Sequence, residues 1–243
     1  AVLRSGMKLP HGKDSIPEKM HISLRGKRML TKSEMMVYEM LANHDWTRPL
    51  YMSTTLGPEN YAGLDNNLML EGLAFRIVPY TIKGGNGLDS DRMYDNMMHK
   101  FRYGNMKQKG IYVDETVMRM CYTHRRIMAQ LALHLISEGD KQKASKVLQK
   151  AEKELPPYNI PYSYMNGGLD IARAYALLGQ TAKAKEVANA VWTQGQQYLN
   201  WYLSLDGSRF ANSMNDCMLQ IYILRQTAAV MGMADKQAAA QQE

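Results

Sequence analysis

Apolar residues recur at helical spacing over most of the chain beyond residue 30. Thr31 and Glu34 have the spacing of a capping box, so the first helix is expected to begin at Thr31 and to end near Asn43. A second helical pattern covers residues 89–101, and a longer one runs over residues 114–137. The acidic residues that open these two segments are expected to cap the helices.

Shorter segments in the first third of the chain are rich in strand-forming residues. Residues 49–55 and 73–80 are expected to form strands of a small sheet, and residues 21–24 a further short strand. Residues 64–72 are expected to form a short helix. The glycine-rich residues 82–88 lack the lysine and hydroxyl ending of a phosphate-binding loop, so we expect a flexible connection there.

The pattern of small and large apolar residues repeats with an offset of 40 positions in the second half of the chain. Small residues coincide in three pairs: Ala132 with Ala172, Gly139 with Gly179, and Ala144 with Ala184. Glycine permits the left-handed backbone that ends a helix, and alanine lets two antiparallel helices approach closely. These are the positions of a tetratricopeptide helix–turn–helix, whose period is about 34 residues. The prolines of residues 156–161 supply the extra length between the units.

These patterns predict a mostly helical protein, α+β overall, in which a small α/β segment with a short sheet precedes tetratricopeptide-like helical hairpins. The predicted divisions are an irregular lead-in (1–30), a small α/β subdomain (31–112) and the helical repeats (113–243). The repeats are expected at about 125–158, 165–198 and 213–240. The third is the weakest, with Gly232 as its turn and a short, polar second helix as an end cap.

Composition narrows the function classes without indicating a chemistry. With 45% apolar residues the chain can bury a core, and its +7 charge is modest and spread along the sequence, so no nucleic-acid partner is expected. No apolar run is long enough to span a membrane, and no signal-peptide pattern is present. The start at Ala1 indicates a fragment of a longer protein. Many of the 20 methionines, Met36, Met40 and Met97 among them, fall at helical spacings and are expected in the core.

No catalytic or metal-binding pattern stands out. Cys121 and Cys217 are 96 positions apart in apolar helical patterns, which favours buried free thiols, although their pairing stays open. The six histidines form no zinc spacing, and no serine elbow or cysteine–histidine pair is evident. We therefore expect no catalytic residue, no metal and no cofactor in this chain.

Two groups of residues are candidate binding sites. Arg48, Asp65, Glu71 and Arg76, with Tyr51 nearby, flank the predicted strands and are expected to form either an ion-pair network, the favoured interpretation, or a ligand pocket. Tyr198, Trp201 and Tyr202, followed by Phe210, gather after the second repeat. They favour a hydrophobic seam, with a face that contacts peptide or glycan as the alternative.

Several segments resemble a family of large bacterial multi-pass membrane proteins that is catalogued as a domain of unknown function and is similar to protein O-mannosyltransferases. The resemblance is carried by NHDWTRPLY at 43–51, GLD at 63–65, LEGLAFRIVP at 70–79, MYDN at 93–96 and YLSLD at 202–206. It implies a soluble extracytoplasmic domain with tetratricopeptide-like repeats that follows an N-terminal membrane region, on the periplasmic face of the inner membrane. Catalytic residues of such an enzyme would lie in that membrane region. Ser15 lies in a short sequence resembling a bacterial O-glycosylation acceptor, and a chance match is favoured.

The leading functional hypothesis is a non-catalytic scaffold that binds a polypeptide, a membrane-protein partner or its own N-terminal membrane region. The alternative is a direct part in glycosyl transfer or acceptor binding through Arg48, Asp65, Glu71 and Arg76. A third hypothesis is a purely structural cap on the membrane region.

Overall fold

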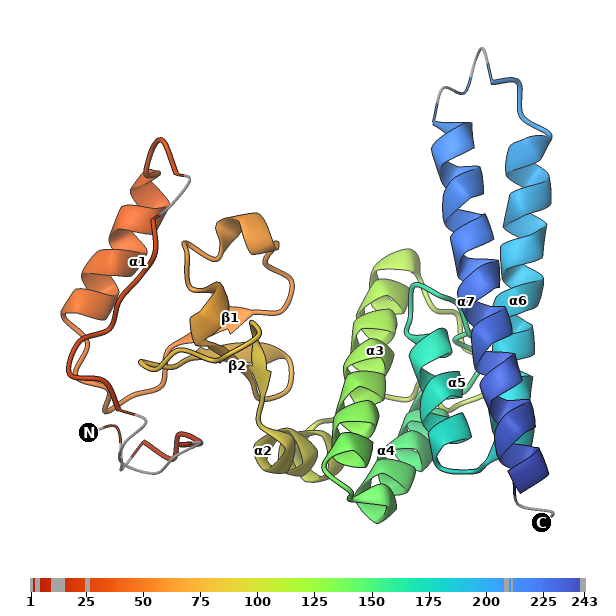
Figure 1. The fold of residues 1–243 in the computed structure, drawn as a ribbon, viewed down its shortest axis with the longest axis horizontal. Helices are drawn as coiled ribbons and strands as arrows, with labels where there is room; N and C mark the ends of the chain where they lie inside the picture. The colour runs from red at the N-terminus through yellow and green to blue at the C-terminus, as the bar shows by residue number, and fades with distance from the viewer. Residues whose placement is uncertain are drawn as a thin grey trace. The chain divides into compact units, whose positions relative to one another are not determined.

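The computed structural model describes residues 2, 5–9, 16–24, 27–207, 210 and 212–240 (Figure 1). Over these residues the chain forms seven α-helices and a four-stranded sheet, so the predicted mostly helical α+β class is confirmed. The contacts within the chain divide it into two units, Ala1–His99 and Lys100–Glu243. The sheet belongs to the first unit, and the longer helices belong to the second.

Helix α1, Lys32–Ala42, begins where the capping-box spacing predicted. The Thr31 hydroxyl accepts a hydrogen bond from the Glu34 amide, and the Glu34 carboxylate accepts one from the Thr31 amide at 2.9 Å. At the other end the Asn43 amide donates to the Glu39 carbonyl. Local side-chain chemistry therefore sets where this helix begins.

The methionines of α1 lie on its surface, contrary to the prediction that they enter the core. Met36 and Met40 are 58% and 54% exposed, whereas Met97 is fully buried. Spacing along a helix indicates which residues share a face, but it does not show whether another element covers that face.

The sheet has the strand order β1-β3-β2-β4. Its strands are β1 (Tyr51–Ser53), β2 (Leu68–Leu70), β3 (Ala74–Ile77) and β4 (Gly87–Leu88). β3 pairs antiparallel with β1 and β2, and β4 pairs parallel with β2. In this register Tyr51 lies opposite Arg76, so two of the predicted site residues occupy neighbouring strands.

The lead-in packs against this unit. Met20 and Ile22 pack on the apolar cluster that contains the fully buried Leu64 and Leu68, and Met7 belongs to a cluster with Val78. Residues 21–24 form no strand, so that prediction was wrong. Strand-forming side chains in a segment do not provide the neighbouring backbone with which a strand must pair. Ser15 lies outside the described residues.

Residues 64–72 do not form the predicted helix. A short 3-10 helix, Asp65–Asn67, leads directly into β2, whose three residues are all buried. The Asn67 side chain donates to the carbonyls of Val78, at 3.2 Å, and Tyr80, at 2.9 Å, and so ties the start of β2 to the chain beyond β3. A short, continuous apolar run fits a buried strand and a buried helix equally well, and here the hydrogen bonds to β3 and to the residues after it favour the strand.

Helix α2, Ser90–Asp95, confirms the second helical segment, and a π-helical turn, Asn96–Lys100, continues it. The Asp89 carboxylate accepts a hydrogen bond from the Arg92 amide at 3.1 Å, so Asp89 caps the helix as predicted. Two 3-10 turns, Pro58–Asn60 and Asp65–Asn67, complete the first unit.

The second unit begins with two helical hairpins. Its helices are α3 (Glu115–Ser137), α4 (Lys141–Glu154), α5 (Gly168–Leu177), α6 (Thr181–Leu203) and α7 (Ser213–Ala240). Gly139 between α3 and α4 and Gly179 between α5 and α6 have φ angles of +88° and +75°, the left-handed conformation that glycine adopts most easily. Ala132, Ala144, Ala172 and Ala184 are all fully buried. The small residues at the matched positions thus lie between closely packed helices.

The last helix differs from the prediction. α7 is one continuous helix through Gly232, so the predicted third turn, and with it the second helix of that repeat, is wrong. α7 packs along α6 (Figure 1), and Asp235 forms an ion pair with Lys185 of α6 at 2.5 Å. A single glycine costs a helix about 1 kcal/mol, which long packing contacts readily outweigh.

In the described part of the chain, no helix is both long and apolar enough to cross a membrane. Cys121 and Cys217 are both buried, and both are free.

Candidate functional site

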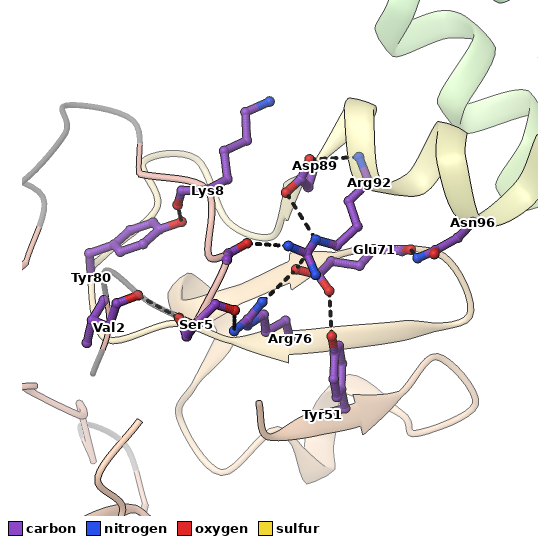
Figure 2. A network of polar contacts seen from close by, with 11 residues as sticks. Val2, Ser5, Lys8, Tyr51, Glu71, Arg76, Tyr80, Asp89, Arg92 and Asn96 are labelled. Carbon is purple, nitrogen blue, oxygen red and sulfur yellow. Dashed lines mark hydrogen bonds and ion pairs between the residues drawn. The ribbon is translucent and has the colours of Figure 1, made fainter. Parts of the chain in front are cut away.

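Glu71, which follows β2, is the centre of a buried polar network (Figure 2). The Tyr51 hydroxyl donates to Glu71 Oε2 at 2.6 Å, and Arg76 Nη1 lies 3.4 Å from Glu71 Oε1. Arg92 Nε approaches the same Oε1 at 3.4 Å. Because Glu71 and Arg76 are only 4% and 1% exposed, their charges depend on these partners for stability.

The network also holds the lead-in through its backbone. Arg76 Nη2 donates to the Ser5 carbonyl at 2.8 Å, Arg92 donates to the Gly6 carbonyl, and Tyr80 donates to the Lys8 carbonyl (Figure 2). Burial raises the pKa of Tyr80 to about 12, so its hydroxyl keeps its proton and remains a donor.

Most of the polar groups in this network are already paired. Arg92 also lies 4.0 Å from Asp89, so two arginines face the two carboxylates of Glu71 and Asp89. Burial and the hydrogen bond to Glu71 raise the pKa of Tyr51. Among the described residues, Arg76 Nε is the one buried side-chain nitrogen or oxygen of the network without a hydrogen-bond partner. These contacts are those of an internal ion-pair network.

The structure separates the predicted residues Arg48 and Asp65 from this network. Both are exposed, and within the described residues no hydrogen bond or ion pair joins either of them to Glu71 or Arg76. Arg92 and Asp89 take their places. Sequence reasoning treated Asp89 as a helix cap and passed over Arg92, although Arg92 lies three residues along the same helix face. The alternative of a part in glycosyl transfer stays a prediction.

The second predicted group, in the helical unit, forms an aromatic surface at the end of α6. Tyr198 and Tyr202 stack with ring centroids 6.3 Å apart, and Trp201 lies 4.8 Å from Tyr202. Tyr198 and Trp201 are 45% and 54% exposed. These rings therefore offer apolar area to the surroundings, unlike the paired groups around Glu71.

Two hollows border this aromatic surface. The first, which we call the tyrosine hollow, has a volume of about 300 Å³ and is lined by Tyr122, Ser163, Tyr164, Met165, Gln194, Tyr198, Tyr202, Leu219, Gln220 and Ile223. The second, the tip hollow, has a volume of about 470 Å³ and is lined by Trp201, Tyr202, Leu205, Phe210, Asn212, Ser213 and Asp216. All three predicted residues line at least one hollow, and Tyr202 lines both.

A third hollow was missed by sequence reasoning. This arginine hollow, of about 400 Å³, is lined by Arg126, Tyr164, Met165, Gly167, Leu169, Asp170, Arg173, Tyr222 and Gln226. Tyr164 and Met165 also line the tyrosine hollow, so the two share a wall. Its residues come from α3, α5, α7 and the connection before α5, and only folding brings such distant segments together.

Arg125, fully buried on α3, organises the connection that carries this shared wall. Its guanidinium donates to the carbonyls of Leu155 and Ile160, each at 2.6 Å, and of Pro161 at 3.2 Å. It also lies over the Tyr162 ring, 4.7 Å from the centroid. Burial lowers the pKa of Arg125 to about 10, which leaves it charged at neutral pH. A buried cation here satisfies the carbonyls of a proline-rich connection that cannot form a helix.

The Asn166 side chain fixes the end of the same connection. Its Oδ1 accepts a hydrogen bond from the Ser163 amide at 3.0 Å, and its Nδ2 donates to the Pro161 carbonyl at 2.6 Å. Tyr164 and Met165 are thereby presented between the two hollows. No group of three or more histidine, cysteine or acidic side chains placed to hold a metal occurs in the part of the chain that the structure describes.

By fold and site, the chain is an α+β protein that combines a small sheet stabilised by buried ion pairs with a helical unit that carries open, aromatic hollows. Residues 1–97 match the family model described as TMEM260-associated domain 2. The match falls within the Ala1–His99 unit, and the family has no assigned function. Neither curated proteins nor solved structures include a significant match to the chain.

Proposed function

We propose that this chain is a non-catalytic interaction domain that binds a polypeptide partner along the hollows of its helical unit. One observation carries the proposal: the three hollows form a row, in which each shares lining residues with the next. Tyr164 and Met165 join the arginine and tyrosine hollows, and Tyr202 joins the tyrosine and tip hollows. A row of adjoining hollows offers contacts along its length to an elongated ligand.

The lining chemistry favours a polypeptide over a glycan. Tyrosine offers a flat apolar ring with a hydroxyl, and the amides of Gln194 and Gln220 both donate and accept, as the peptide backbone requires. Met165 and Leu219, 64% and 42% exposed, add aliphatic surface that matches apolar side chains. A glycan-contacting surface is the alternative outcome of the test below.

We also propose that the two hairpins are tetratricopeptide-like repeats. The support is the offset of 40 residues, the left-handed glycines at both turns and the burial of the matched alanines. Helical hairpins that stack side by side create extended surfaces on which such proteins bind partners.

The proposed setting is the periplasmic face of the inner membrane, in a membrane glycosyltransferase-like protein similar to the O-mannosyltransferases. This part rests on the sequence segments that resemble that family, most of which lie in the first unit. In that setting the partner is a polypeptide acceptor, a membrane-protein subunit or the protein's own N-terminal membrane region.

Screening of the intact chain against a library of immobilised peptides and glycans tests the proposed function. We expect peptides to bind, and Tyr198→Ala together with Tyr202→Ala to weaken them at least about tenfold, since buried aromatic anchors dominate such interfaces. Tyr112→Ala is the matched control, because Tyr112 lies in the same unit, is 90% exposed and lines none of the three hollows. Binding of glycans alone, or equal peptide binding by all variants, would contradict the proposal.

A further inference from the structure

The arginine hollow holds more positive charge than its own residues neutralise. Two arginines, Arg126 and Arg173, line it together with a single carboxylate, Asp170. Arg173 pairs with Asp170 at 3.8 Å. The Arg126 guanidinium forms no hydrogen bond or ion pair with the described residues, so its five donors remain available to a ligand.

Neutral donors surround this charge. Tyr164 and Tyr222 meet edge to face with their ring centroids 6.4 Å apart, and both line the hollow with the amide of Gln226. Burial, with Tyr222 and Asp170 nearby, raises the pKa of Tyr164, so its hydroxyl keeps its proton at neutral pH. An anion in the hollow would meet a free guanidinium and phenolic donors together.

The backbone holds Arg126 against the start of α5. Gly167 has a φ angle of +76°, and a Cβ placed on it would lie 2.9 Å from the Arg126 Cα. Only glycine allows this approach, which places the start of α5, with Asp170 in its first turn and Arg173 in its second, beside α3. The charge of the hollow thus sits on two packed helices, so its position is set by the fold.

We propose that the arginine hollow binds an acidic side chain, aspartate or glutamate, of the polypeptide whose apolar residues occupy the tyrosine hollow. This inference rests on the proposed function and adds a charge requirement to it. The argument is charge complementarity and continuity: the ligand must supply the anion that the hollow lacks, and the shared wall of Tyr164 and Met165 lets one segment reach both hollows.

The test compares matched peptides chosen from the library that binds the intact chain. In each peptide, one position at a time is replaced by glutamate or by glutamine. Both versions are made with a free and with an amidated carboxyl end. Binding is measured by fluorescence anisotropy with the unaltered chain, Arg126→Gln, Arg126→Lys and Arg119→Gln. Arg119 is the matched control, because it is an exposed arginine on the same helix that does not line the hollow.

We expect the unaltered chain to prefer the glutamate peptide about tenfold, in line with one charged hydrogen-bonded contact. Arg126→Gln should abolish this preference, Arg126→Lys should retain part of it, and Arg119→Gln should leave it unchanged. Added salt should reduce it.

Three results would overturn the inference by itself. Equal binding of glutamate and glutamine peptides would do so while leaving the proposed function in place. So would a full preference in Arg126→Gln, or a dependence on the free carboxyl end in place of the side chain. A library in which no peptide binds would contradict the proposed function and this inference together.

Discussion

The two units of this chain use polar and aromatic side chains in opposite ways. Around Glu71 in the first unit, a tyrosine hydroxyl, two arginines and two carboxylates are directed at one another and at the lead-in backbone, and little remains for a ligand. In the second unit, Tyr198, Trp201 and Arg126 are directed away from the core. Residue type alone therefore does not distinguish a binding site from a structural network. The distinction lies in whether the polar groups are already paired with one another.

The largest expected effect concerns the first unit, where the polar groups around Glu71 are paired with one another. Glu71→Ala leaves Arg76 buried without its carboxylate and removes the acceptor of Tyr51, which should lower the free energy of unfolding by about 3–5 kcal/mol. Urea unfolding monitored by circular dichroism measures it. Asp65→Ala, an exposed residue from the same predicted set, should change stability by less than about 0.5 kcal/mol. Equal losses in the two variants would show that Glu71 is not the centre of the network.

The second effect concerns the small residues packed between the helices of the helical unit. Ala184→Leu inserts three carbons where no exposed surface remains, so it should cost about 1–3 kcal/mol through overpacking. Ala182→Leu, on the exposed side of the same helix, should change stability little. Thermal unfolding of both variants provides the comparison. If both variants unfold like the parent chain, the close approach of α6 to its neighbours is not required for stability.

The smallest effect sharpens the contrast between tyrosines. Tyr51→Phe removes the hydroxyl that donates to Glu71 and should cost about 1 kcal/mol, a value reduced because Tyr51 is partly exposed. Tyr198→Phe removes a hydroxyl from an open hollow and should cost less than about 0.5 kcal/mol. Both changes in the free energy of unfolding are obtained from the midpoints of urea unfolding curves with the same denaturant dependence (m-value). A larger loss for Tyr198 than for Tyr51 would reverse our distinction between support and site.

Elements with a local signal could be predicted from the sequence. The capping box of Thr31 and Glu34, the caps at Asp89 and Asp114 and the glycine turns depend on residues a few positions apart, so their spacing indicates the structure. The pairing of Glu71 with Arg76 lies within this range as well, because Glu71 directly follows β2 and only a short turn separates it from β3, which carries Arg76.

Features that depend on distant segments could not be predicted. Residues 68–70 of the run 64–72 form a strand because β3 pairs with them, and Gly232 stays helical because α6 packs along α7. The methionines of α1 are exposed, and the periodicity of the sequence cannot reveal whether another element covers them. Arg126, an exposed residue of α3, becomes a candidate only once α5 and α7 contribute the other lining of the hollow, and no signal in its own neighbourhood marks it.

The grip on the lead-in has a practical consequence for anyone who trims this protein. Arg76, Arg92 and Tyr80 donate hydrogen bonds to the backbone carbonyls of residues 5, 6 and 8. These contacts therefore require that the segment be present, and they depend little on which side chains it carries. Most substitutions in residues 5–9 should be tolerated, apart from those of Gly6, whose φ angle of +68° favours glycine, and of Met7 and Leu9, which pack among apolar neighbours. A shortened version that starts after Leu9 would instead remove the acceptors of Arg76, Arg92 and Tyr80 at the same time. It should be less stable than the parent chain, although the helices and strands of the first unit would all be kept.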